Sequence, residues 1–130
     1  MSYLLDTTTL AEVLRASPSP GFVRRLSQVP ANNRWTSAIS VSQLLLAARR
    51  ENKARLMQSI IRLVAAIRVV PYDLAAAQSF AKFRSTVAAE AETDDVMIAA
   101  IACSKDYTLV TRRMDDFRLY PNLRLENWVG

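Results

Sequence analysis

The sequence predicts an α/β sandwich built around a mainly parallel sheet, and three observations support this. Short apolar runs of strand length alternate along the chain with helical patterns, an order that pairs strands in parallel. Apolar residues make up 51% of the chain and charged residues 22%, as in a globular protein. The 130 residues are about one domain in length, and neither a linker nor a repeat divides them. We therefore expect a single domain over residues 1–130.

Two strands and two helices are expected in the first part of the chain. The first strand is a short apolar run that ends at Asp6. The serines and prolines from Ser17 to Pro20 separate two helical segments, because proline cannot continue a helix. β-Branched and aromatic residues predict the second strand. In order, the expected elements are strand Tyr3–Leu5, helix Thr9–Arg15, helix Phe22–Gln28 and strand Trp35–Ile39.

The middle of the chain predicts three helices and a third strand. Apolar residues recur at three- and four-residue spacing in two segments, which is the pattern of helices with one buried face. Asp73 is a candidate N-cap for an alanine-rich helix. The expected elements are a helix from Val41, helix Leu56–Val64, strand Arg68–Tyr72 and helix Leu74–Val87.

The last part of the chain predicts one strongly apolar helix and two strands. The acidic stretch Glu90–Asp95 precedes the helix Val96–Ala102. The strands are expected at Tyr107–Thr111 and Leu123–Leu125. A ligand site in a parallel sheet lies beyond the carboxyl ends of the strands, so polar residues at those ends are the functional candidates.

The composition excludes several kinds of active site. The chain has no histidine, which rules out histidine-based triads and histidine metal sites. Its single cysteine, Cys103, excludes an internal disulfide and a thiolate zinc site. Two glycines are too few for a glycine-rich phosphate loop. Any chemistry must therefore use carboxylates, hydroxyls, amides, lysines and arginines.

The charge balance favours a nucleic-acid partner. Lys and Arg total 17 against 12 Asp and Glu, a net charge of +5, and most of the cations are Arg. Arginine matches phosphate oxygens in two-point geometry, although an Arg-rich genome would produce the same bias. The start of the chain lacks the apolar segment of a signal peptide, and no uncharged stretch is long enough to span a bilayer. We expect a soluble, cytoplasmic protein with no membrane partner.

Polar side chains follow the expected strands or open the apolar helix. They are Asp6 after the first strand, Gln43 early in the helix after the second, Asp94 and Asp95 at the apolar helix, and Asp115 and Asp116 past the fourth strand. Clustered carboxylates repel one another, so a protein keeps them together mainly to hold a hard cation such as Mg²⁺ or Mn²⁺. Such an ion lowers the pKa of a bound water and polarises a phosphodiester, which allows hydrolysis without histidine.

Each acid also has a purely structural interpretation. Asp6 is a candidate cap for the first helix, and Asp94 and Asp95 complement the dipole of the apolar helix. Asp115 and Asp116 are ordinary turn residues. The hypothesis of a metal site therefore depends on all these positions together.

Four short motifs follow one another along the chain and carry a family resemblance. They are Leu4–Thr7, Ser37–Leu44, Asp95–Ala100, and Leu109–Thr111 with Asp116–Phe117. Pro71–Asp73 with Ala76, Phe83–Arg84 and the ending Leu123–Trp128 fit the same pattern. In order and spacing they resemble PIN-domain ribonucleases, especially the VapC-like toxins of type II toxin–antitoxin systems. The resemblance covers nearly the whole chain.

The resemblance implies a three-layer α/β/α sandwich around a mainly parallel, roughly five-stranded sheet. It also implies an endoribonuclease that depends on Mg²⁺ or Mn²⁺. By position, Asp6, Asp95 and Asp116 would take the acidic roles of the family and bind metal directly or through water, for in-line attack on RNA. A homodimer and a cognate antitoxin that covers the acidic groove are implied as well.

The sequence departs from the family pattern at the second motif. The family normally has a glutamate where this chain has Gln43, so the site loses one negative charge and its metal affinity should fall. Glu12 and Asp94 are candidate replacements for that carboxylate. The candidate auxiliary residues are Asp94, Asp115, Glu12 and Thr111.

Two further departures concern the first and fourth motifs. Thr8 stands where the family usually has asparagine, and Arg113 stands where a small polar or acidic residue is common. Arg112 and Arg113 either bind RNA phosphate or neutralise Asp115 and Asp116.

Three functions are therefore compatible with the sequence. The first is a ribonuclease toxin whose site is weakened or altered by Gln43. The second is a catalytically silent PIN-fold module that binds RNA or a partner protein. The third keeps the nuclease site but acts on DNA. Gln43 favours the silent module, whereas Asp6, Asp95 and Asp116 favour an enzyme.

Overall fold

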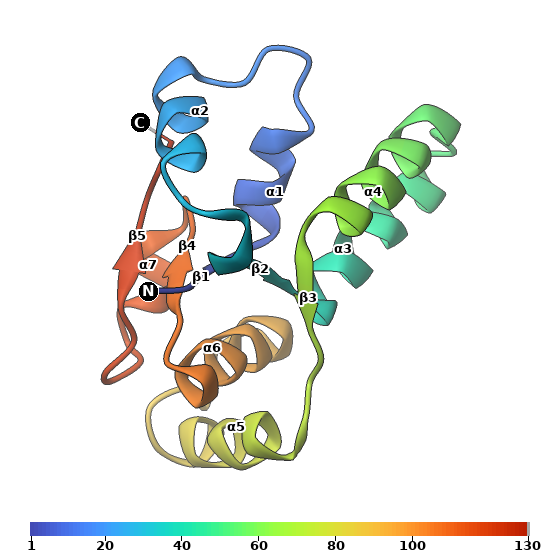
Figure 1. The fold of residues 1–130 in the computed structure, drawn as a ribbon. Coiled ribbons are helices and arrows are strands. Elements are labelled where there is room, and N and C mark those ends of the chain that lie inside the picture. The colour runs from blue at the N-terminus through green and yellow to red at the C-terminus, as the bar shows by residue number, and fades with distance from the viewer. Residues whose placement is uncertain (130) are drawn as a thin grey trace.

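The computed structural model describes residues 1–129, and within them five strands form one sheet in which every neighbouring pair is parallel. The strand order is β3-β2-β1-β4-β5, so the first strand lies at the centre of the sheet (Figure 1). The strands are β1 Tyr3–Leu5, β2 Arg34–Ser37, β3 Arg68–Val70, β4 Thr108–Val110 and β5 Leu125–Glu126. The predicted parallel α/β architecture is confirmed.

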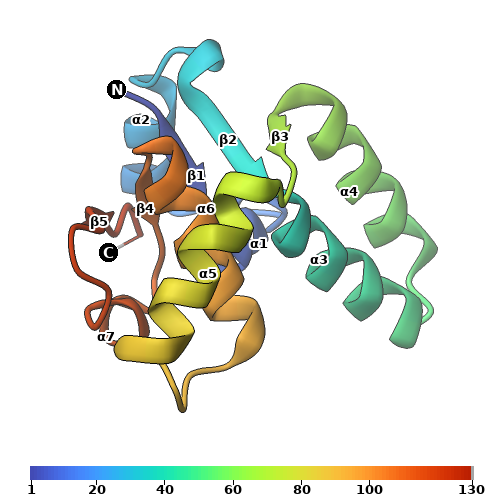
Figure 2. The same cartoon turned by 90° about the horizontal axis from the view of Figure 1, so that it is seen from below.

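Helices cover both faces of this sheet. They are α1 Thr7–Val13, α2 Pro20–Ser27, α3 Ala38–Arg50, α4 Ala54–Ala66, α5 Leu74–Thr86, α6 Thr93–Lys105 and α7 Met114–Phe117. Figure 1 shows α1 and α2 on one side of the sheet and α5 and α6 on the other. The view from below in Figure 2 shows α5 packed along α6, with α3 and α4 extending outward as a pair near β3. The result is the expected three-layer sandwich.

The core is divided by the alternation of side chains along the central strands. Leu4 and Leu109 point into the cluster that includes α5 and α6, whereas Leu5 and Val110 point into the cluster with Phe22 of α2. All four strand residues are fully buried. Successive strand residues face opposite sides of a sheet, and each buried side chain of this size contributes about 1.5–3 kcal/mol. These short apolar strands therefore hold the two helical layers together.

The second strand ends earlier than the sequence predicts. The apolar and β-branched content predicts strand over Trp35–Ile39, but β2 ends at Ser37 and α3 begins at Ala38. The Ser37 side chain accepts a hydrogen bond from the Ser40 backbone N–H and caps the new helix. A serine at the N-cap outweighs the strand preference of the residues that follow it.

The fourth motif contains a helical turn that the sequence did not predict. Asp115 and Asp116 lie in α7 rather than in an open turn. At the other acidic motif, α6 begins at Thr93, so that Asp94 and Asp95 belong to its first turn. Among residues 1–129, no helix has the length and apolarity needed to cross a membrane.

Candidate active site

Asp6 leaves the carboxyl end of β1 and is tied to the end of β4. Its Oδ1 accepts hydrogen bonds from the Thr9 backbone N–H at 2.9 Å and from the Thr8 hydroxyl at 2.7 Å. Its Oδ2 accepts from the Thr111 hydroxyl at 2.6 Å. The side chain is fully buried and caps α1, so the predicted cap is confirmed. The same contacts place Asp6 at the sheet edge where the functional residues were expected.

Asp95 and Asp116 are brought together by one guanidinium group. Arg113 Nη2 donates to Asp95 Oδ1 at 2.7 Å, and Nη1 donates to Asp95 Oδ2 at 3.0 Å. Nη1 also donates to Asp116 Oδ2 at 3.2 Å. The Asp95 hydrogen bonds raise the pKa of Arg113 above its ordinary value, so the fork is fully charged.

Gln43 is held between two other elements at the same edge. Its amide nitrogen Nε2 donates to Asp94 Oδ2 at 3.0 Å, and its Oε1 accepts a hydrogen bond from the Thr7 hydroxyl. The amide therefore links α3 to the first turns of both α1 and α6. A glutamate in this position would have no proton to donate to Asp94.

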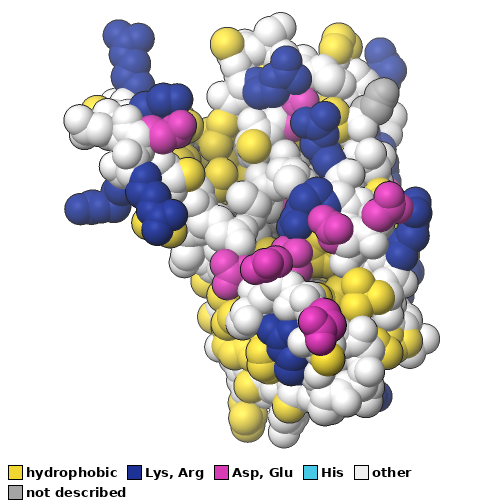
Figure 3. All heavy atoms as spheres, turned by 180° about the vertical axis from the view of Figure 1, so that it is seen from behind, with side chains coloured by type: hydrophobic (Ala, Val, Ile, Leu, Met, Phe, Trp, Pro, Cys, Tyr) yellow, Lys and Arg dark blue, Asp and Glu magenta, His cyan; other side chains and the backbone are white. Residues whose placement is uncertain are grey.

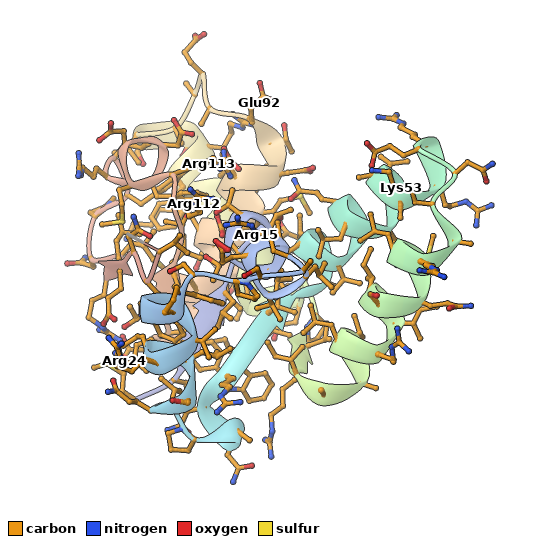
Figure 4. All side chains as sticks on the ribbon, turned by 90° about the horizontal axis from the view of Figure 1, so that it is seen from above. Arg15, Arg24, Lys53, Glu92, Arg112 and Arg113 are labelled. Atoms are coloured by element: carbon orange, nitrogen blue, oxygen red, sulfur yellow. The ribbon has the colours of Figure 1, made fainter. Side chains whose placement is uncertain are left out.

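These side chains line two open hollows that share a wall. The first measures ≈ 290 Å³ and is lined by Thr7, Thr8, Gln43, Glu92, Asp94, Asp95 and Arg113. The second measures ≈ 540 Å³ and includes Asp95, Arg113, Asp115 and Asp116 in its lining. Glu92, Asp95 and Arg113 line both the hollow at Gln43 and the hollow at α7. Figure 3 shows acidic and basic side chains gathered next to one another, and Figure 4 shows Arg113 between Glu92 and Arg112.

The predicted acids share this edge but do not form a ready metal site. Within residues 1–129, no group of three or more Asp, Glu, Cys or His side chains is placed to hold a metal ion. The Arg113 guanidinium stands between Asp95 and Asp116, and both oxygens of Asp6 accept hydrogen bonds. The side chains still offer carboxylate and amide oxygens, the donors that Mg²⁺ and Mn²⁺ prefer. The chemistry of these donors therefore fits such an ion.

Two of the candidate auxiliary acids are engaged elsewhere. Glu12 is buried, and both its oxygens accept from Arg15 Nη1 at 2.9 Å. It lines neither hollow. Asp115 is exposed and forms an ion pair with Arg118, which corrects the expectation that Arg112 or Arg113 neutralises it.

Sequence reasoning missed two partners at the site. Thr7 was not recognised as the hydroxyl that donates to Gln43, 36 positions away. Arg118 was not recognised as the partner of Asp115, although their i,i+3 spacing is a usable signal within a helical turn. No local pattern pairs Arg113 with Asp95, because 18 positions separate them.

A model of the PIN domain family matches residues 3–121 of this chain. Toxin FitB of Neisseria gonorrhoeae is 34% identical over 125 residues, covering 88% of this chain and 89% of that protein. Ribonuclease VapC2 of Rickettsia felis is 24% identical, covering 98% of each. Similarity therefore extends over almost the full length of both relatives.

A solved structure has the same fold. It is the crystal structure of VapBC2 from Rickettsia felis bound to a DNA fragment from their promoter. The TM-score is 0.87 at 23% sequence identity, and the match covers 98% of this chain and 99% of that one. This chain and that solved structure therefore share the same overall fold.

Proposed function

The chain belongs to the PIN domain family, and on this premise we propose that it is a metal-dependent endoribonuclease, the toxin of a type II toxin–antitoxin pair. One observation carries the proposal: Asp95 and Asp116, from two separate motifs, meet around one group at the carboxyl edge of the parallel sheet. The names of the relatives, a toxin and a ribonuclease, support it.

We assign the metal to the oxygen donors of this edge. Asp95 and Asp116 would hold it, with Asp6 and the Gln43 amide oxygen contributing directly or through water, and Mg²⁺ or Mn²⁺ suits this donor set. A bound divalent ion supplies an activated water and polarises the scissile phosphate. Asp6 is fixed by three hydrogen bonds, so it enters the reaction with its orientation already set.

The RNA backbone is assigned to the basic side of the same edge. Arg112 is exposed, and among residues 1–129 its side chain forms no ion pair, which leaves its guanidinium free to bind phosphate. Its backbone N–H donates to the Thr8 hydroxyl at 3.1 Å and fixes the start of the loop. The net charge of +5 favours the same polyanion.

The proposed protein partners rest on the names of the relatives. FitB is named a toxin, and the Rickettsia felis relative is solved as the pair VapBC2. We propose a cognate antitoxin for this chain, which covers the acidic groove, and a homodimer of the toxin.

The first experiment is a cleavage assay with purified protein free of antitoxin. A mixed pool of single-stranded RNA and a matched DNA pool are incubated with Mn²⁺ or Mg²⁺, with EDTA as the control. We expect RNA cleavage that EDTA abolishes. Cleavage of DNA alone would assign the site to a DNA nuclease.

A catalytically silent RNA-binding module is the second candidate function. The Arg113 fork on Asp95 and the Gln43 amide favour it, because both reduce the negative charge available to a metal. A folded protein that binds RNA but cleaves neither pool with either metal would establish this alternative.

Restoring the carboxylate at position 43 should strengthen metal binding. In Gln43→Glu the new carboxylate faces Asp94, where the amide donates at 3.0 Å, so the two charges repel until a cation lies between them. We expect about tenfold tighter Mn²⁺ binding by calorimetry. Gln58→Glu, on an exposed position of α4, is the control and should leave the affinity unchanged. Equal or weaker binding by Gln43→Glu would refute the shared acidic site.

A further inference from the structure

We propose that Arg113 is a built-in counter-ion of the acidic site, which competes with the divalent cation and holds the metal-free site closed. This inference rests on the proposed metal-dependent function and concerns its regulation. Three guanidinium contacts carry it: two to Asp95, at 2.7 and 3.0 Å, and one to Asp116 at 3.2 Å.

The fork engages both oxygens of Asp95. A divalent ion of the Mg²⁺ type approaches a carboxylate oxygen to about 2.0–2.1 Å, closer than any hydrogen-bond donor. Each Asp95 oxygen accepts one of these contacts and keeps a second lone pair, but an ion bound there would lie beside the positive guanidinium, so the two cations repel each other. Because Nη1 reaches Asp116 while both nitrogens reach Asp95, departure of the whole guanidinium frees both carboxylates at once.

Arg113 is held in this position rather than being a loose surface side chain. Its backbone N–H donates to the Thr111 hydroxyl at 2.9 Å, and that hydroxyl in turn donates to Asp6. Its guanidinium carbon lies 5.2 Å from the centre of the Phe117 ring. The side chain is 35% exposed, against 65% for the neighbouring Arg118, and Asp95 is 11% exposed. A charge-assisted fork on a nearly buried carboxylate is a strong contact for a cation to displace.

The surroundings give the side chain a place to move. A third open hollow of ≈ 360 Å³ lies on the outer side of Arg113, lined by Arg112, Arg113, Met114, Asp115, Asp116 and Arg118. Withdrawal of the guanidinium into it would also take Arg113 out of the common lining of the hollows at Gln43 and at α7, which Glu92 and Asp95 also share. Asp95 would then face both hollows without its counter-ion.

The test is Mn²⁺ binding to the full chain by titration calorimetry. We expect Arg113→Ala to bind Mn²⁺ about tenfold or more tightly than the unaltered protein, because the ion no longer displaces a charged fork. Arg118→Ala is the matched control: it removes the same charge from an exposed neighbour and should change the affinity less than about threefold. An unchanged or weaker affinity in Arg113→Ala, or an equal gain in both variants, would overturn the inference.

A second readout separates competition from a general structural effect. At a given concentration, a ligand that binds the folded state more tightly stabilises it more, so Mn²⁺ should raise the melting temperature of Arg113→Ala more than that of the unaltered chain. If Arg113→Ala does not fold, Arg113→Gln keeps most of the side-chain volume without the charge and is measured in its place. An equal temperature increase in both proteins would contradict the competition.

Failure of this inference is distinguishable from failure of the proposed function. Tighter Mn²⁺ binding by Arg113→Ala without RNA cleavage by any form supports the counter-ion and rejects the nuclease. Metal-dependent cleavage by the unaltered chain, with no gain in Mn²⁺ affinity on removing Arg113, supports the nuclease and rejects the counter-ion.

Discussion

Replacing Asp95 with asparagine is expected to reduce metal-dependent RNA cleavage by a factor of about 100 or more. Asp95 lines both hollows and is the acid held most closely by the charged fork of Arg113. Asparagine has nearly the same shape but lacks the negative charge and one of the two acceptor oxygens. The cleavage rate of the RNA pool at saturating Mn²⁺ measures the effect.

The control for this substitution lies at the other end of the same helix. Asp106 follows α6, pairs with Arg124 and has a side chain 85% exposed. Its backbone is left-handed, with φ of 58°, a conformation that asparagine adopts readily. We expect Asp106→Asn to keep the unaltered cleavage rate. A rate in Asp95→Asn close to that of this control would remove Asp95 from the reaction.

Replacing Asp6 with alanine is expected to lower the free energy of unfolding by about 2–4 kcal/mol. The substitution removes the cap of α1 and leaves the Thr9 N–H and the Thr8 and Thr111 hydroxyls without their acceptor. Asp6 is fully buried, so water cannot readily replace the lost oxygens. Urea denaturation monitored by circular dichroism measures the loss.

Two variants show whether burial causes this cost. Asp73→Ala removes another capping aspartate, one whose side chain is 36% exposed and pairs with Lys105, and it should lose less than half as much stability. Asp6→Asn keeps an oxygen for the cap, so its loss in the free energy of unfolding should lie between the losses of Asp6→Ala and Asp73→Ala. Equal losses in Asp6→Ala and Asp73→Ala would show that capping alone, without the buried network, accounts for the effect.

The substitutions at Gln43 and Arg113 both change the net charge of the site. Gln43 carries no charge and Arg113 carries a positive charge at an edge that otherwise holds carboxylates. The two changes act in the same direction, so Gln43→Glu and Arg113→Ala should each tighten metal binding. Gln43 donates to Asp94 and Arg113 donates to Asp95, the next residue in the chain, and both side chains line the same hollow. The two effects are therefore expected to couple in the double variant.

The sequence by itself determined the parallel α/β architecture and the edge at which the site lies. The apolar runs at β1 and β4 predict buried strands, because a strand covered on both faces has no polar side. Asp6 and Asp73 were predicted as caps, and each accepts the hydrogen bond of the third residue after it. These features depend on residues close together in the chain, where propensity and spacing are informative.

Only the tertiary structure decided which partner each polar side chain has. Arg113 meets Asp95 across 18 positions, and Gln43 meets Thr7 across 36 and Asp94 across 51. Periodicity describes one element at a time, whereas these contacts require the ends of α1, α3 and α6 to be placed by the sheet. The sequence places three acids and an arginine near one edge. The folded backbone determines the distances between these side chains, and it places the Arg113 guanidinium within hydrogen-bond distance of both Asp95 and Asp116. A charged guanidinium forms strong hydrogen bonds with carboxylates within its reach.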